Sequence, residues 1–223
     1  MIDRETLIEN LTRSLRASDS ARAAWLGGSD ATGRTDRWSD IDIAVVVEDD
    51  AVEETFVRVE HSLAELSPIS IRMRIPQPTW HGFDQSFYQL RDAEPTLMID
   101  LSVIKRSNPE KFLEPERHGN AITLFDRDDI VKPAPLDRRA LAARMRARLE
   151  ELRTRFPLFQ NLVTKAVHRD SMVEAVATFH GVTFRPLVDI LRIRYVPERF
   201  DFGSRYLQSD LSAELYLRLE RMV

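Results

Sequence analysis

Cysteine is absent from this 223-residue sequence. Its absence excludes disulfide bonds, thiolate nucleophiles and cysteine-ligated zinc or iron–sulfur centres, so any bound metal must use oxygen or imidazole ligands. The phosphate-binding patterns G-x-x-x-x-G-K-[ST] and G-x-G-x-x-G are also missing, which argues against a P-loop kinase or a dinucleotide-binding enzyme. No apolar run approaches the roughly 20 residues that a membrane-spanning helix needs. The N-terminal stretch MIDRETLIENL lacks an apolar secretory segment, and we therefore expect a cytoplasmic protein without a membrane partner.

The composition, with 43% hydrophobic and 30% charged residues, is that of an ordinary globular protein. Charge is distributed unevenly along the chain. Residues 1–133 contain 16 basic and 25 acidic residues, a net charge of −9, whereas residues 134–223 contain 16 basic and 11 acidic residues, a net charge of +5. This difference, together with a change in hydrophobic periodicity, predicts two domains, 1–133 and 134–223.

Helices and strands are mixed in the first part. Leu7, Ile8, Leu11 and Leu15 recur at three- and four-residue intervals, which predicts an amphipathic helix over residues 4–17. The β-branched run IDIAVVV predicts a buried strand over 41–47. Similar reasoning predicts a helix at 53–66 and strands at 22–27, 69–75 and 97–104. The expected fold class is therefore α+β, a small mixed sheet packed on helices.

Strand signals nearly vanish after residue 137, and the second domain is predicted to be all-α. A long helix is marked by an apolar stripe, and we expect Pro157 to end it. Shorter helices are expected at 158–168, 171–180 and 184–194, and a final one around 210–221. The stripe consists of Leu141, Met145, Leu149, Leu152 and Phe156.

The stretch GGSDATGRTDRWSDID, residues 27–42, combines two features typical of phosphate chemistry. Gly28 and Ser29 allow close approach of the backbone to a phosphate and supply a hydroxyl donor for it. Asp40 and Asp42 are two residues apart at the head of a strand, so they should project from the same face and offer oxygen ligands to a divalent cation such as Mg²⁺.

Asp100 lies within the apolar strand sequence LMIDLSVI, where an unpaired carboxylate would cost several kcal/mol. A metal shared with Asp40 and Asp42 would give it a partner. If the strands are neighbours, three carboxylates converge, as two-metal phosphoryl or nucleotidyl transfer requires.

This order, Gly-Ser, then Asp-x-Asp on a strand, then a later strand aspartate, resembles the nucleotidyltransferase superfamily that includes DNA polymerase β. The two-domain layout is most similar to the bacterial antibiotic (aminoglycoside or lincosamide) nucleotidyltransferases and the minimal nucleotidyltransferases. The resemblance covers roughly residues 20–105. It implies that Gly28 and Ser29 contact the nucleoside triphosphate, that Asp40, Asp42 and Asp100 bind two Mg²⁺ ions, and that Asp100 helps to deprotonate an acceptor hydroxyl.

The expected function is Mg²⁺-dependent transfer of a nucleoside monophosphate, AMP from ATP, to a hydroxyl of a small molecule such as an antibiotic, with release of pyrophosphate. Two alternatives stay open: an acceptor that is a protein or tRNA, and a non-catalytic nucleotide-binding or antitoxin-like module. Antibiotic-modifying relatives often place an acidic base for the acceptor where Glu174 lies, on the expected helix 171–180, but we do not count Glu174 among the site residues. One departure stands out, because Asp30 follows the serine where many family members carry a residue friendlier to phosphate; Arg34 or Arg37 could supply the missing charge.

Overall fold

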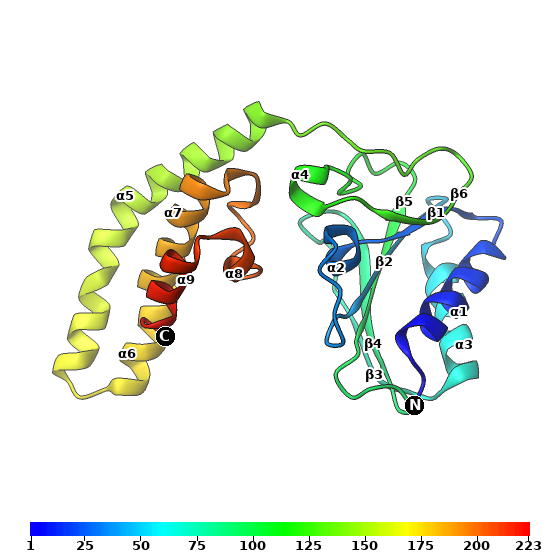
Figure 1. The fold of residues 1–223 in the computed structure, drawn as a ribbon, viewed down its shortest axis with the longest axis horizontal. Coiled ribbons are helices and arrows are strands. Elements are labelled where there is room, and N and C mark those ends of the chain that lie inside the picture. The colour runs from blue at the N-terminus through cyan, green and yellow to red at the C-terminus, as the bar shows by residue number, and fades with distance from the viewer. The chain divides into compact units, whose positions relative to one another are not determined.

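The computed structural model describes all 223 residues, which divide into two compact units, Met1–Leu136 and Asp137–Val223. The first unit is built on a six-stranded sheet and the second is helical (Figure 1). The predicted α+β class, with a helical C-terminal region, is confirmed. None of the helices is both long and apolar enough to cross a bilayer.

The sheet of the first unit has the strand order β3-β4-β5-β2-β1-β6. Its central pair, β2 and β5, is parallel, and every other neighbouring pair is antiparallel. The strands are β1 Ala21–Leu26, β2 Ile41–Val47, β3 Ile69–Arg74, β4 Asp84–Leu90, β5 Ile99–Lys105 and β6 Ile122–Asp126. The helices of this unit are α1 Arg4–Arg16, α2 Gly28–Thr32, α3 Val52–Leu66 and α4 Pro115–His118.

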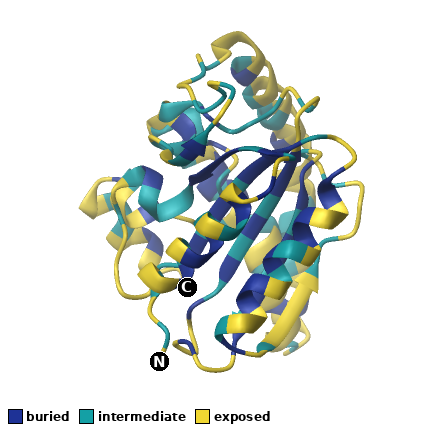
Figure 2. Cartoon of the chain, turned by 90° about the vertical axis from the view of Figure 1, so that its right-hand side faces the viewer, coloured by how far each residue is buried: buried dark blue, intermediate teal, exposed yellow.

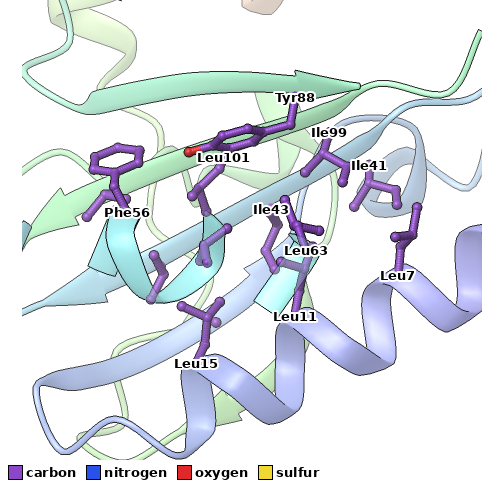
Figure 3. Close-up of a cluster of buried hydrophobic side chains, with 14 of the residues drawn as sticks. Leu7, Leu11, Leu15, Ile41, Ile43, Phe56, Leu63, Tyr88, Ile99 and Leu101 are labelled. Atoms are coloured by element: carbon purple, nitrogen blue, oxygen red, sulfur yellow. The ribbon is translucent and has the colours of Figure 1, made fainter. Parts of the chain in front are cut away.

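Helices α1 and α3 cover one face of the sheet. The main core lies between these helices and the strands (Figure 3). Leu7, Leu11 and Leu15 are fully buried because residues four apart share one face of a helix. They pack with Ile41 and Ile43 of β2, which alternate with partly exposed residues along the strand. Figure 2 shows the same alternation of buried and intermediate residues on the central strands. Helix α1 begins after Asp3, whose side chain accepts a hydrogen bond from the Thr6 amide at 2.8 Å.

The opposite face of the sheet is covered over part of its area by the chain that follows β5. Trp25, Val46 and Ile104 on the strands pack there with Leu113, and Ile130 and neighbouring residues cover them. Val46 and Ile104 lie near the ends of β2 and β5 that are distant from Asp42 and Asp100, and neither carboxylate belongs to this second cluster.

The second unit contains α5 Arg138–His168, α6 Met172–Phe179, the π-helical turn η1 His180–Phe184, α7 Arg185–Tyr195, the 3-10 turn η2 Pro197–Arg199, α8 Leu207–Asp210 and α9 Ala213–Glu220. Its apolar core is small and centres on Val188 and Leu207. A fully buried ion pair joins Arg192 of α7 to Asp210, with 2.9 Å between Arg192 Nη1 and Asp210 Oδ2. Arg192 Nε also donates to the Gly203 carbonyl at 2.6 Å, so the buried guanidinium is well supplied with acceptors.

The structure corrects two expectations. Pro157 does not end the long helix: α5 continues through it to His168 and includes the separate helix expected at 158–168. Residues 153–158 are exposed, so water can reach the carbonyl that loses its amide partner to proline. Strands β4 and β6 were not predicted. The predicted strands at 22–27, 41–47, 69–75 and 97–104 are present as β1, β2, β3 and β5, with ends that differ by at most two residues.

Candidate nucleotide and metal site

The parallel pairing of β2 and β5 places Asp42 directly opposite Asp100. The neighbours of these aspartates, Ile41, Ile43 and Ile99, are buried in the core beneath α1 and α3. Since successive side chains alternate between faces, Asp42 and Asp100 project from the other face of the sheet. Adjacent strands lie about 4.8 Å apart, so the register brings together two carboxylates that are 58 residues apart in sequence.

Gly28 lies against the Asp42 carboxylate. A Cβ atom built on Gly28 would stand 1.7 Å from Asp42 Oδ2, and the backbone of Gly28 has φ +52°. Both observations require glycine at this position, because a side chain would clash and because L-residues rarely adopt this conformation. The preceding residue, Gly27, donates its amide to the Asp42 carbonyl at 2.8 Å and fixes the backbone of the two segments to each other. The two halves of the stretch 27–42 are therefore in direct contact.

Ser29 follows in the short helix α2, and its side-chain oxygen is buried without a hydrogen-bond partner in the protein. An unsatisfied buried hydroxyl costs about 1–3 kcal/mol, so a ligand oxygen that accepts a hydrogen bond from Ser29 Oγ would remove this cost. The backbone of α2 is fixed by the chain after α4. The backbone amide of Asn120 donates to the Ala31 carbonyl at 2.8 Å. Gly119 lies so close to that carbonyl that a Cβ atom built on it would be 2.3 Å from the oxygen.

Asp40 immediately precedes β2, two residues before Asp42 in the sequence. Its Oδ1 atom accepts a hydrogen bond from the Met98 amide at 3.3 Å. No three histidine or carboxylate side chains in the chain are gathered closely enough to form a ready metal cage. The donor chemistry nevertheless suits a hard divalent cation, since Asp42 and Asp100 are paired and a cation of this kind commonly completes its shell with water and substrate phosphate.

Gln85 was missed in the sequence because its strand, β4, was missed. Its side-chain amide donates to Asp100 Oδ1 at 2.7 Å. The hydrogen bond orients one oxygen of the carboxylate from the neighbouring strand. A glutamine within the sequence DQSFYQL gives no sequence signal of this role, because the contact depends on the pairing of β4 with β5.

Asp30, the departure from the expected pattern, forms an ion pair with Arg4 at the start of α1. Their side chains are 12% and 15% exposed, respectively. Arg4 Nη2 also donates to the Asp40 carbonyl at 3.1 Å. The negative charge beside Ser29 is therefore compensated by a residue far from the glycine-serine stretch in sequence. Arg37, one of the two arginines considered for that role, stacks over the ring of Trp38 at 4.1 Å.

Glu174 lies in the first turn of α6 in the helical unit and is exposed. We considered it from the sequence as a base for the acceptor and do not assign it to the site.

Residues 8–89 match the nucleotidyltransferase domain family. The matched segment begins in α1 and ends in β4, and it includes the glycine-serine pair with Asp40 and Asp42. Asp100 and the helical unit lie outside it. No curated protein sequence matches the chain.

Proposed function

Since this chain belongs to the nucleotidyltransferase superfamily, we propose that it transfers a nucleoside monophosphate, AMP from ATP, to a hydroxyl group of a small molecule such as an antibiotic. The reaction depends on Mg²⁺ and releases pyrophosphate. The superfamily gives the general reaction, nucleotidyl transfer; the metal, the base and the acceptor are parts of the proposal.

One observation carries the proposal to named residues: Asp42 is paired with Asp100 across parallel strands and is at the same time in contact with Gly28. Carboxylates that hold a cation and a loop that binds phosphate act on one ligand when its phosphate oxygens reach both the cation and the loop. The buried and unpartnered Ser29 hydroxyl at the same loop supports this arrangement.

In the proposed reaction Ser29 Oγ donates a hydrogen bond to the triphosphate, and the glycine backbone leaves space for it. The oxygen of the acceptor hydroxyl forms a bond to the α-phosphorus, the bond from that phosphorus to the bridging oxygen breaks, and pyrophosphate leaves with the bond electrons. Asp100 accepts the hydroxyl proton and passes it to solvent. The hydrogen bond from Gln85 holds Asp100 in a fixed orientation for this role.

Asp42 and Asp100, with Asp40 beside them, would hold the divalent cations. When bound, such ions neutralise the charge of the phosphates and make the acceptor hydroxyl more acidic.

The helical unit is proposed to select the acceptor. Aminoglycosides are polycations and favour acidic surfaces, so the net charge of +5 over residues 134–223 favours less basic acceptors.

The test is to incubate the protein with α-labelled nucleoside triphosphates, Mg²⁺ and a panel of lincosamides, aminoglycosides, tRNA and proteins. Asp42→Asn is the site variant. Asp50→Asn is the matched control, because Asp50 is an exposed aspartate beyond the opposite end of β2. Mg-nucleotide binding is measured in parallel by calorimetry.

We expect label on a small-molecule acceptor with the wild type and with Asp50→Asn, and at least a hundredfold less with Asp42→Asn. Label on tRNA or protein alone would replace the small-molecule acceptor. Nucleotide binding without transfer would favour the binding module. If the wild type binds no Mg-nucleotide and labels nothing above the Asp42→Asn background, the proposal is wrong.

A further inference from the structure

We infer that Arg4 is a positioning residue of the nucleotide site, whose charge makes the acidic loop at Asp30 compatible with a bound triphosphate. The inference rests on the proposed function, since it concerns binding of the same phosphates.

Arg4 connects the two halves of the site. It lies at the first position of α1, outside the residues that match the family. Its guanidinium forms the ion pair with Asp30, the residue after Ser29, and donates to the main chain of Asp40, two residues before Asp42. Asp30 is in the phosphate loop and Asp40 is in the metal half. One side chain thus fixes the distance between the loop that would hold phosphates and the strand that would hold their cations.

Arg4 also balances the charge of Asp30. Asp30 directly follows Ser29, so its carboxylate belongs to the loop that is proposed to bind phosphate. A carboxylate and a triphosphate repel each other, and the repulsion is weakly screened where side chains are largely withdrawn from water. Arg4 and Asp30 are both mostly buried, so their opposite charges cancel locally. Without Arg4, the same loop would present an uncompensated negative charge to the nucleotide.

An ion pair that only anchors α1 to α2 should respond differently to mutation from one that compensates the charge of Asp30. If Arg4 only anchors α1 to α2, removal of Asp30 in addition to Arg4 cannot restore anything. If Arg4 compensates the charge of Asp30, neutralisation of Asp30 relieves the repulsion and binding recovers. The double variant therefore separates the two roles.

The experiment measures the dissociation constants of Mg-ATP and of inorganic tripolyphosphate by calorimetry for Arg4→Met, Asp30→Asn and the double variant. Arg13→Met is the matched control, because Arg13 is an exposed arginine of the same helix. Tryptophan fluorescence verifies that each variant is folded.

For Arg4→Met we expect about tenfold weaker binding of both ligands at low salt, the size expected for one partly buried charge pair. The double variant should recover most of the loss, and Arg13→Met should bind as the wild type does.

Equal affinities of Arg4→Met and wild type, or equal affinities of Arg4→Met and the double variant, would overturn the inference while leaving the proposed function in place. Absence of binding by the wild type itself would overturn both.

Discussion

Gly28→Ala tests most directly whether the glycine-serine loop and the carboxylate strand form one site. The substitution has two separable costs. At φ +52° an alanine is strained by about 1–2 kcal/mol. Its methyl group would also lie 1.7 Å from Asp42 Oδ2 and 2.5 Å from Asp42 Cγ, so the carboxylate must leave its rotamer, at about 1 kcal/mol. Together we expect a loss of about 2–3 kcal/mol in the free energy of unfolding of the first unit.

Gly33→Ala is the control for the backbone cost alone. Gly33 has φ +66°, in the same left-handed region, but a Cβ there meets no atom within 4 Å. We expect this variant to lose only the backbone cost of about 1–2 kcal/mol and to keep its activity. Gly28→Ala should lower nucleotidyl transfer about a hundredfold, because displacement of a reacting group by about 1 Å has an effect of that size.

The assay is urea unfolding followed by tryptophan fluorescence. All three tryptophans, Trp25, Trp38 and Trp80, are in the first unit, so the fluorescence signal does not report unfolding of the second, helical unit. A second test places Gly28→Ala in an Asp42→Ala background, where the clashing carboxylate is gone and the added destabilisation should fall toward that of Gly33→Ala. If Gly28→Ala and Gly33→Ala are equally stable and equally active, the contact between Gly28 and Asp42 has no functional importance and our reasoning is refuted.

Three further predictions concern other parts of the molecule. Gln85→Leu removes the hydrogen bond to Asp100 and should lower the transfer rate about tenfold, as expected for a hydrogen bond to a charged group; an unchanged rate constant would exclude a role in orienting that carboxylate. Asp210→Asn leaves the buried Arg192 charge uncompensated and should destabilise the helical unit by about 3–5 kcal/mol in thermal unfolding followed by circular dichroism, whereas a shift below 1 kcal/mol would mean that the pair is hydrated. Burial raises the pKa of Tyr88 to about 12 from 10.0. The unfolded chain therefore loses this proton first, so stability should fall as the pH rises from 10 to 12; Tyr88→Phe should remove that component, and an identical pH dependence in the variant would contradict it.

The elements that the sequence predicted well are those whose apolar residues recur at a regular period or form a continuous run. Helix α1 repeats leucine at a helical period, and β2 is a β-branched run that is buried on the core side. Strand β4 was missed because its inward positions begin with Asp84 and Ser86, which hide the alternation of apolar and polar residues that identifies a strand. The short edge strand β6 has too few residues for a periodicity to be recognised.

The residues proposed for the site could be named from the sequence because they lie close together in it or stand out within an apolar strand. Arg4 and Gln85 could not. Each is a common polar residue whose importance depends on a contact with a distant segment: Arg4 with Asp30, and Gln85 with Asp100. The continuation of α5 through Pro157 was also beyond the sequence pattern, because it depends on the exposure of the surrounding helical turn.

The pairing of β2 with β5 has a consequence for the order of events during folding. Parallel strands need a crossover, and here the crossover contains α3, β3 and β4, so β5 is the last strand of the site to be synthesised. A nascent chain that ends at residue 96 would contain the whole family-matched segment, yet β2 would have an open edge where β5 belongs. Such a chain cannot yet bring Asp100 to Asp42. The proposed binding of Mg-nucleotide would therefore begin during translation only after β5 has left the ribosome, and it would report the pairing of β5 with β2 even before the edge strand β6 is added.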